Sequence, residues 1–401
     1  MNNLVFSDAI SRIAPSPTVA MTQKARELRA AGRDVIALSV GEPDFDTPPH
    51  VAEAAIAAIR AGDTRYTAID GTPALKAAIA AKFQRDNGLT YNDNEVAATP
   101  GGKFLIFAAF MATLNAGDEV IIPAPYWVSY PAIPQLMGAE AIIAPTTADD
   151  GFILKPDALE AAITPRTKWL VLNSPGNPTG AVYSHDDLAA LAAVLRRHPH
   201  VWILSDDIYE HIVFDTPFAT IAAVAPDLKD RTLIVHGASK AYAMTGWRLG
   251  FGAGPAPLIT AMRKLASQST TNPCSVSQAA CRAALQGDHL FLDDWRSSYR
   301  RRRDLVVNSL NAIPGFECQT PQGAFYVYPS CAGLIGRRHE GQVLQTDLDV
   351  AEAILSAQAV ATVPGTAFGM SPFLRLSYAT DDASLTEALS RIGQFVEGLT
   401  D

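Results

Sequence analysis

The chain has 401 residues, enough for one large domain and a smaller one. Hydrophobic residues make up 48% of the sequence and charged residues 18%, which is typical of a globular protein with a large core. Lysine and arginine total 32 against 41 aspartates and glutamates, so the formal net charge is −9. The four arginines at residues 300–303 form the only notable run of basic residues in the sequence. We therefore expect neither nucleic acid nor a membrane as a partner.

Strand-like and helix-like segments alternate through the middle of the chain. Short apolar runs predict strands at residues 119–123, 141–144, 169–172, 201–204, 233–235 and 249–253. Alanine-rich patterns predict helices at 101–114, 186–197 and 257–267. Strands that alternate with helices indicate an α/β fold, in which helices flank a mostly parallel sheet of the seven-stranded type.

The C-terminal part has a different order of elements. It predicts a helix at 290–312, strands at 316–319 and 324–328, a helix at 347–358, strands at 360–363 and 374–378, and a helix at 384–398. This order is typical of a smaller α+β domain. We expect residues 46–290 to form the large domain, and residues 1–45 and 291–401 to form a discontinuous small domain.

The cysteines and the N-terminal residues bear on the cellular compartment in which the protein works. The four cysteines contain no Cys-x-x-Cys pair and no Cys/His cluster with zinc spacing, so we expect no metal site and a reducing cytoplasm. The first residues lack the basic and apolar segments of a signal peptide. The most apolar stretch, residues 104–112, is too short to span a bilayer.

The segment around Lys240 is the most informative about chemistry. It reads GASKAYAMTGWR over residues 237–248 and follows a predicted strand. A lysine amine condenses with an aldehyde to form a Schiff base. Ser239 and Arg248, on either side of this lysine, can bind a phosphate. An aldehyde and a phosphate together describe pyridoxal 5′-phosphate (PLP).

Two further segments at the ends of predicted strands fit this cofactor. Gly101, Gly102 and Lys103 open a helix, where glycines and free N–H groups favour a phosphate, although an ordinary tight turn has the same pattern. Asp206 could pair with the pyridine nitrogen, and Tyr209 could hydrogen-bond to the ring oxygen. A helix-capping aspartate is the alternative.

Two residues with large side chains complete the pattern. Trp127 could stack on the pyridine ring or lie in the core. Arg375 lies inside an apolar strand, and a buried arginine is rare unless it is paired. Its planar guanidinium suits the α-carboxylate of a substrate.

Together these motifs resemble those of the class I, fold-type I aminotransferases over residues 11–391. The resemblance implies that Lys240 carries PLP and, once freed, moves the Cα proton of the substrate, with Asp206 and Tyr209 as further catalytic residues. The cofactor-binding residues that it implies are Tyr66, Gly101, Gly102, Lys103, Trp127, Asn177, Asp206, Tyr209, Ser239, Lys240 and Arg248. The substrate-binding residues that it implies are Gly41, Lys103, Trp127, Asn177 and Arg375.

The resemblance also implies a homodimer with shared active sites, in which Tyr66 reaches the phosphate of the neighbouring subunit. Gly101-Gly102-Lys103 and PYWVSYP at residues 125–131 are typical of the prokaryotic Iβ aspartate aminotransferases. There the lysine that matches Lys103 can receive the second carboxylate of aspartate. We therefore expect an amino group to move between an L-amino acid, aspartate or glutamate, and a 2-oxo acid.

Three positions depart from the family pattern. Gly176 precedes Asn177 where relatives usually have asparagine, and Gly237 stands where many have serine. Ala14 replaces a lysine that relatives often carry near the start. This third departure weakens the case for dicarboxylate substrates, and for prephenate especially.

Other functions remain open from the sequence. A nicotinamide dehydrogenase needs Gly-x-Gly-x-x-Gly after an early strand, and the glycines at 250, 252 and 254 have the wrong spacing. A PLP-sensing regulator would need a DNA-binding domain and a basic surface. An aminotransferase of broader or aromatic and neutral specificity, or a PLP-dependent lyase on the same fold, shares the cofactor residues. A lyase differs because it does not convert PLP to pyridoxamine phosphate with an amino acid alone.

Overall fold

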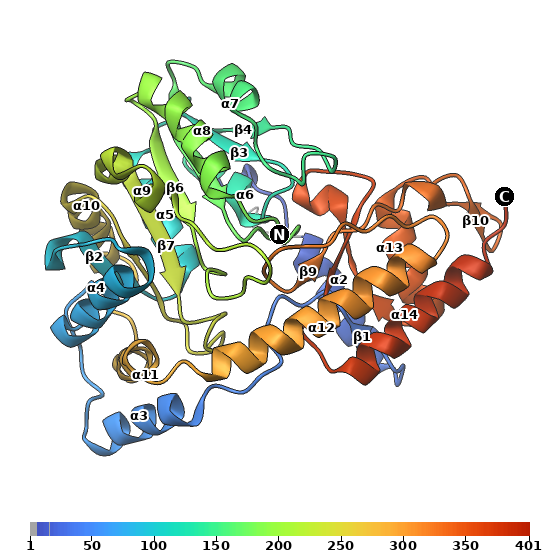
Figure 1. Ribbon diagram of the computed structural model, residues 1–401, viewed down its shortest axis with the longest axis horizontal. Helices are drawn as coiled ribbons and strands as arrows, with labels where there is room; N and C mark the ends of the chain where they lie inside the picture. Colours follow the sequence, from blue (N-terminus) through green and yellow to red (C-terminus); the bar gives the residue numbers. More distant parts are fainter. Residues whose placement is uncertain (1–5, 16) are drawn as a thin grey trace.

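The computed structural model describes residues 6–15 and 17–401. Figure 1 shows a large lobe on the left and a smaller lobe on the right, with the long helix α12 (Phe291–Ala312) running from one to the other. This helix was predicted from the sequence with nearly the same bounds.

A seven-stranded sheet forms the centre of the large lobe, with the strand order β2-β8-β7-β6-β5-β3-β4. The strands are β2 (Val96–Thr99), β3 (Glu119–Pro123), β4 (Glu140–Ala144), β5 (Thr167–Asn173), β6 (Trp202–Asp206), β7 (Thr232–Gly237) and β8 (Gly250–Ala253). Only β8 runs antiparallel to its neighbours in this sheet, and the other pairs are parallel. The predicted α/β fold with a mostly parallel sheet is confirmed.

Helices cover both faces of this sheet (Figure 1). They are α4 (Pro73–Asn87), α5 (Gly102–Thr113), α6 (Ser129–Leu136), α7 (Pro156–Ala162), α8 (His185–Arg197), α9 (Ile221–Val224), α10 (Ala256–Ser267) and α11 (Ser275–Gln286). A further helix, α3 (Pro49–Arg60), packs on α11 and projects from the large lobe (Figure 1). On β5, Trp169 and Val171 face a core shared with α5 and α10, whereas Leu170 and Leu172 face a core shared with α8. Because both faces are buried, the strand is a continuous apolar run, which is why it could be found in the sequence.

Side-chain caps set the starts of two helices of the large lobe. Before α4, the hydroxyl of Thr72 accepts a hydrogen bond from Leu75 N, and Pro73 takes the first helical position, which needs no donor. Before α8, Ser184 and Asp187 form a reciprocal capping box. The caps therefore fix where these helices begin, and α8 begins within one residue of the helix predicted at 186–197.

The small lobe combines the N-terminal segment with the C-terminal part. Its helices are α1 (Asp8–Ser11), α2 (Pro17–Ala30), α13 (Asp347–Gln358) and α14 (Asp382–Glu397). Its short strands are β1 (Ile36–Ala37), β9 (Tyr326–Val327), β10 (Arg338–His339), β11 (Gln342–Val343), β12 (Val360–Ala361), β13 (Val363–Pro364) and β14 (Leu374–Ser377). Short 3₁₀ helices lie at Asp93–Glu95, Pro226–Arg231, Ala332–Leu334 and Gly365–Phe368.

One hydrophobic core joins the two ends of the chain. Met21, Ala25 and Leu38 pack there with buried residues of α12, α13 and α14. Parallel pairing of β1 with β12 adds a backbone link. We propose on this packing that residues 1–45 and 291–401 form one discontinuous domain and residues 46–290 the other, although residues 1–5 and 16 lie outside the described part. The same core includes Tyr209 and Ile212 of the large lobe.

The predicted strand at 316–319 is wrong. Only an isolated bridge between Glu317 and Ser330 forms there. The side chain of Asn311 accepts a hydrogen bond from Cys318 N at 2.8 Å and donates one to Cys318 O at 2.9 Å, so it replaces a strand neighbour. The predicted strand at 324–328 is shortened to β9, because Ala324 has a φ of 57°.

The predicted strand at 360–363 is divided in two. β12 pairs with β1, whereas β13 pairs with β14 in a three-stranded sheet. A single apolar run thus serves two sheets, a change that its sequence does not mark.

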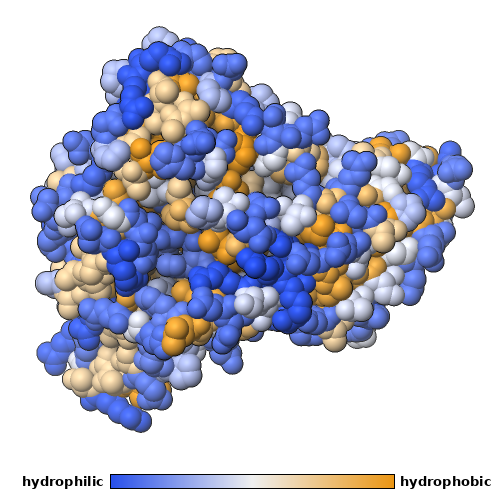
Figure 2. Space-filling model, in the orientation of Figure 1, coloured by the Kyte–Doolittle hydropathy of each residue, from blue (hydrophilic) through white to orange (hydrophobic). Residues whose placement is uncertain are grey.

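The surface is mainly polar on the face shown in Figure 2, where strongly hydrophilic side chains gather between the large lobe and α12. Apolar side chains appear there as separate small patches. Within residues 6–15 and 17–401, no helix has the length and apolar character needed to cross a membrane.

Candidate active site

The predicted site residues meet at the carboxyl edge of the central sheet, where β5, β6 and β7 end side by side. A cavity of about 530 Å³ opens there between the two lobes. The predicted residues that line it are Gly41, Gly102, Lys103, Trp127, Asn177, Asp206, Tyr209, Lys240 and Arg375. Gly101 and Ser239 directly precede the lining residues Gly102 and Lys240, and the guanidinium of Arg248 lies against Gly101. Tyr66 lies on the surface with 90% of its area exposed.

Lys240 follows β7 and projects into the cavity. Its Nζ donates a hydrogen bond of 2.6 Å to the backbone oxygen of Gly41. Burial lowers the pKa of this amine to about 8; Glu42 opposes the shift, and Arg375 adds to it. A pKa near neutrality makes the free amine available as a nucleophile and a base.

Asp206 is the last residue of β6 and is buried. Its Oδ2 accepts a hydrogen bond of 2.7 Å from the hydroxyl of Tyr130, and Oδ1 accepts one of 3.3 Å from Ile208 N. Burial raises the pKa of the carboxyl to about 6, although the Tyr130 hydroxyl and the Lys240 ammonium favour the charged form. A cationic nitrogen in the cavity would therefore find a carboxylate held in place.

Tyr209 lies beside the lysine. Its hydroxyl is 2.9 Å from the hydroxyl of Tyr326, and Lys240 Nζ lies 5.9 Å from the centre of the Tyr209 ring. Asn173 Nδ2 donates a hydrogen bond of 2.9 Å to the backbone oxygen of Asp206. The segment that carries Asp206 and Tyr209 is thus tied to the end of β5.

The phosphate-binding residues predicted from the sequence lie close together. Gly101 has a φ of +91°, and a Cβ there would lie only 2.5 Å from Nη2 of Arg248. Ser239 is buried, and its hydroxyl forms no hydrogen bond with the described residues. Gly102 and Lys103 open α5, whose first N–H groups are free to bind an anion. This donor set, together with Asp206 and Lys240, fits PLP.

Lys103 is a second cation at the cavity. Its Nζ lies 4.8 Å from the centre of the Trp127 ring, so the ammonium forms a cation–π contact with the face of the indole. Burial and the nearby Arg248 lower the pKa of this amine. Lys103 has no carboxylate partner in the described part of the chain, so it can bind an anion.

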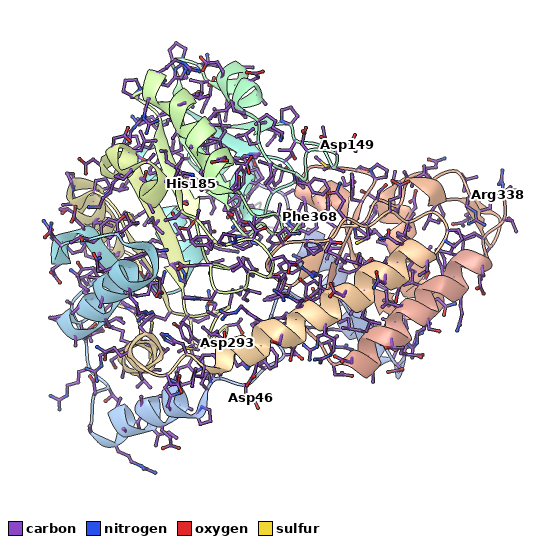
Figure 3. The ribbon with its side chains drawn as sticks, viewed as in Figure 1. Asp46, Asp149, His185, Asp293, Arg338 and Phe368 are labelled. Carbon is purple, nitrogen blue, oxygen red and sulfur yellow. The ribbon has the colours of Figure 1, made fainter. Side chains whose placement is uncertain are left out.

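Arg375 is a buried cation that also lacks a carboxylate. Nη1 donates a hydrogen bond of 3.0 Å to Oδ1 of Asn177, and Nη2 donates one of 2.6 Å to the backbone oxygen of Ser39. Nε is buried and has no partner among the described residues. The guanidinium lies 5.0 Å from the ring centre of Phe368, which Figure 3 labels at the junction of the two lobes. A bound carboxylate would satisfy this arginine.

The family described as aminotransferase class I and II matches residues 33–392 of this sequence. The chain belongs to this family. The aminotransferase therefore uses PLP and moves amino groups between amino acids and 2-oxo acids, as the resemblance implied. An aspartate/prephenate aminotransferase of Cereibacter sphaeroides is 55% identical over 397 residues, which cover 98% of this chain and 99% of the relative.

Solved structures of relatives have the same fold. The aspartate aminotransferase of Rhizobium meliloti matches with a TM-score of 0.97 at 51% identity and covers 99% of this chain and 100% of its own. The aspartate aminotransferase of Thermus thermophilus with maleate matches with a TM-score of 0.92 at 42% identity and covers 98% and 100%. The predicted likeness to prokaryotic aspartate aminotransferases of the Iβ type is confirmed.

The structure adds residues to this aminotransferase site that the sequence did not single out. Tyr130 holds Asp206, and its place three residues after Trp127, in the turn that leads into α6, was an available indication. Tyr326 holds Tyr209 from the small lobe, with no pattern in the sequence to mark it. Arg26 of α2 lines the cavity and forms no ion pair with the described residues.

Proposed function

We propose that this aminotransferase moves the amino group of an acidic L-amino acid, aspartate or glutamate, to a 2-oxo acid. One observation carries the proposal: Lys103 and Arg375, two of the cationic side chains that line the cavity, meet no carboxylate among the described residues. A dicarboxylate can bind both. Relatives named aspartate aminotransferase, one of them solved with maleate, which is a dicarboxylate, support this choice.

PLP, when bound, supplies the electron sink that stabilises negative charge at Cα of the substrate. We propose that Ser239, Arg248 and the N-terminus of α5 bind its phosphate, because these hydrogen-bond donors border the same end of the cavity. Asp206 would pair with the ring nitrogen and keep it protonated. Trp127 lies at the cavity wall and stacks on the ring.

Lys240 has two roles in this proposal. Its amine would hold the cofactor, and as a free amine it would take the proton from Cα of the substrate. Both roles need the uncharged amine, which the pKa of about 8 provides in useful amounts near neutral pH. Tyr209 and the Nδ2 of Asn177 donate to the ring oxygen, since Oδ1 of Asn177 is already bonded to Arg375.

Arg375 binds the α-carboxylate of the substrate, and Gly41 borders the same place through its backbone. Lys103 binds the distal carboxylate. Arg26 is a further cation of the cavity wall. Ala14, which replaces a lysine in the family pattern, is exposed, so the cations at 26 and 103 carry acidic specificity without it.

A homodimer with shared active sites and a cytoplasmic location complete the proposal. Tyr66 is 90% exposed and Arg248 is also exposed, so a tyrosine of one subunit can reach the phosphate site of another. Ile56 and Ile59 present apolar area on α3, 38% and 56% exposed. The four cysteines are free thiols, which suits a reducing compartment.

A half-reaction tests the proposed function. The PLP form is mixed with aspartate, glutamate, alanine or tyrosine alone, and the formation of pyridoxamine phosphate is followed by absorbance. Aspartate or glutamate should react with the highest second-order rate constant. Prephenate is then offered to the pyridoxamine form as an amino acceptor. Faster reaction with alanine or tyrosine would reject acidic specificity, and loss of carbon dioxide or ammonia without pyridoxamine phosphate would indicate a lyase.

A further inference from the structure

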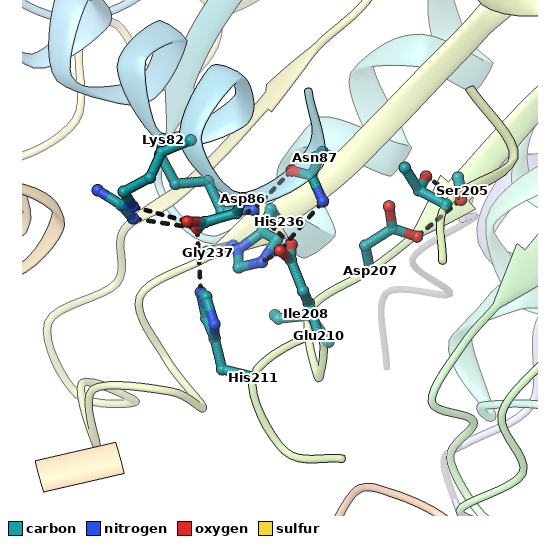
Figure 4. Close-up of polar contacts among 12 residues, drawn as sticks. Lys82, Asp86, Asn87, Ser205, Asp207, Ile208, Glu210, His211, His236 and Gly237 are labelled. Carbon is teal, nitrogen blue, oxygen red and sulfur yellow. Dashed lines mark hydrogen bonds and ion pairs between the residues drawn. The ribbon is translucent and has the colours of Figure 1, made fainter. Parts of the chain in front are cut away.

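A group of buried charged and polar side chains lies behind the cavity wall, between α4 and the ends of β6 and β7 (Figure 4). Lys82 comes from α4, Glu210 follows β6, and His236 lies in β7. Lys82 and His236 are fully buried and Glu210 is 5% exposed. The mechanism above uses none of them, and we call these three residues the buried triad.

Glu210 is the centre of the buried triad. Its Oε2 contacts the ammonium of Lys82 and lies 3.1 Å from Nε2 of His236. Its Oε1 accepts a hydrogen bond of 3.1 Å from Asn87, and Lys82 donates one of 3.0 Å to the same asparagine. Both carboxylate oxygens therefore have directional partners from α4.

The hydrogen bonds of His236 fix the position of its proton. Gly237 N donates to Nδ1 at 2.8 Å, so Nδ1 is an acceptor and the proton of the neutral ring lies on Nε2. Nε2 lies close to the carboxylate of Glu210, but the geometry does not meet the criteria for a hydrogen bond. The Nε2–H dipole therefore interacts electrostatically with this carboxylate. The imidazole stacks on Phe251 with ring centres 5.0 Å apart and planes 15° apart.

Charges in the buried triad balance without an added ion. Burial opposes ionisation of Glu210, but Lys82 and His236 outweigh it and hold the pKa of this carboxyl well below its usual range. Burial and Lys82 lower the pKa of His236, so the imidazole stays neutral. Glu210, His211 and His236 offer ligand atoms within 4.8 Å of one another, as a metal site would. The ammonium of Lys82 already occupies that role, and Nδ1 of His236 is engaged by Gly237.

We propose that Lys82, Glu210 and His236 are positioning residues that hold the two catalytic loops in register with each other. Glu210 directly follows Tyr209 and comes four residues after Asp206, and His236 precedes Lys240 by four residues. The contact between Glu210 and His236 therefore joins the loop of the ring-binding residues to the loop of the lysine. The proposal rests on the roles given above to Asp206, Tyr209 and Lys240.

Directional contacts explain why charged groups are found here. A buried ion pair adds little net stability compared with apolar side chains of the same volume, because desolvation offsets the attraction. What it supplies is a fixed geometry between its partners. A shift of about 1 Å between reacting groups can cost on the order of 10²-fold in rate, so such a geometry matters for catalysis.

Variants at residue 236 test this role, because they change no charge. H236L removes both contacts, whereas H236Q keeps an N–H donor at the place of Nε2. We expect kcat of the half-reaction with aspartate to fall on the order of 10²-fold in H236L with little change in KM, and to recover in large part in H236Q. Cofactor attachment to Lys240 should persist in both, which separates this outcome from failure of the proposed function.

The chain offers a matched control on the same helix. Lys76 is also buried in α4, where its Nζ lies 3.0 Å from Oδ2 of Asp70, but it does not contact either catalytic loop. K82M and K76M each remove one buried ion-paired lysine. K82M should lower kcat, whereas K76M should lower the unfolding temperature and leave kcat nearly unchanged.

Amide hydrogen exchange on the apoenzymes gives a readout that is independent of turnover. Residues 206–211 and 237–240 should exchange faster in H236L and K82M than in the wild type, and at the wild-type rate in K76M. The inference is overturned if both variants lose only thermal stability while kcat and exchange in these loops stay unchanged. Stoichiometric zinc in the purified wild-type protein would also overturn it, because Lys82 could not then be the cation of Glu210.

Discussion

Arg375 of the small lobe donates a hydrogen bond of 3.0 Å to Oδ1 of Asn177 in the large lobe. The same guanidinium donates to the backbone of Ser39, and its buried Nε has no partner among the described residues. Burial lowers the pKa of this arginine, so the charged form is held in an unfavourable place until an anion arrives. A substrate carboxylate would therefore bind where the two lobes already meet.

Replacement of Arg375 by lysine is expected to weaken substrate binding. R375K keeps a positive charge but loses the planar fork that can bind a carboxylate and Asn177 together. Loss of a charge-assisted hydrogen bond costs about 1.5–3 kcal/mol, so kcat/KM for aspartate should fall about ten- to a hundred-fold. R338K, at the far end of the small lobe in Figure 3, is the control and should keep wild-type kinetics. Equal kinetics in R375K would show that the substrate carboxylate binds elsewhere.

Lys240 of the apoenzyme is expected to react with acylating reagents at unusually low pH. Its pKa of about 8 lies below the ordinary 10.5, so the neutral amine appears as the pH rises through 8 rather than through 10.5. Competitive labelling with acetic anhydride, read by mass spectrometry, measures this midpoint against a lysine-containing reference peptide. A midpoint near 10.5 would contradict the burial argument.

Borohydride reduction of the PLP form checks the attachment itself. The cofactor should be recovered on the peptide that contains Lys240, and K240A should lose transamination while it still binds some PLP through the phosphate donors. Recovery of the cofactor on another lysine would reject the assignment.

The large lobe could be predicted well from the sequence because its strands are buried on both faces. β3 was predicted with its observed bounds, and β5 was visible as an apolar run whose alternate residues enter two cores. Glycine-rich and polar segments after these strands pointed to the cavity edge, since parallel strands end together. The same buried parallel strands thus made both the fold and the position of the site residues predictable.

What the sequence did not reveal depends on contacts between distant segments. The side-chain amide of Asn311 takes both backbone hydrogen bonds of Cys318 and so prevents a strand there, although the local residues favour one. Tyr326 meets Tyr209 across 117 positions of the chain. No local pattern encodes such pairs, because they depend on how the small lobe packs on the large one.

Asp206 is expected to be essential for turnover and not for folding. D206A removes the carboxylate that would keep the ring nitrogen protonated, so turnover should fall by orders of magnitude while the far-ultraviolet circular dichroism spectrum is preserved. Y130F is the graded companion, because it removes only the 2.7 Å hydrogen bond to Oδ2. Y130F should lower turnover less than D206A does. Near-normal turnover of D206A would show that the carboxylate has no role in the chemistry.

Mixed dimers are expected to restore activity. If Tyr66 serves the active site of the neighbouring subunit, each site takes Lys240 from one subunit and Tyr66 from the other. K240A and Y66A then remove residues that the two different subunits contribute to a site. Random exchange between the two variants should then regenerate about a quarter of the sites with both residues intact. The activity of refolded mixtures at limiting PLP, compared with each variant alone, measures this. Absence of recovery, or a fully active monomer in sedimentation, would exclude shared sites.

Lys103 is expected to decide between acidic and neutral substrates. Burial and Arg248 lower the pKa of its amine, which lies over Trp127 and lacks a carboxylate partner in the described chain. We therefore propose it as the residue that binds the distal carboxylate of aspartate. In K103M, kcat/KM for aspartate should fall about ten- to a hundred-fold, because a charge-assisted hydrogen bond is lost. Alanine, which has no distal carboxylate, is the internal control and should lose much less. R26Q tests Arg26, a further cation of the cavity wall, in the same way. A matched loss for both substrates in K103M would assign Lys103 to the cofactor instead.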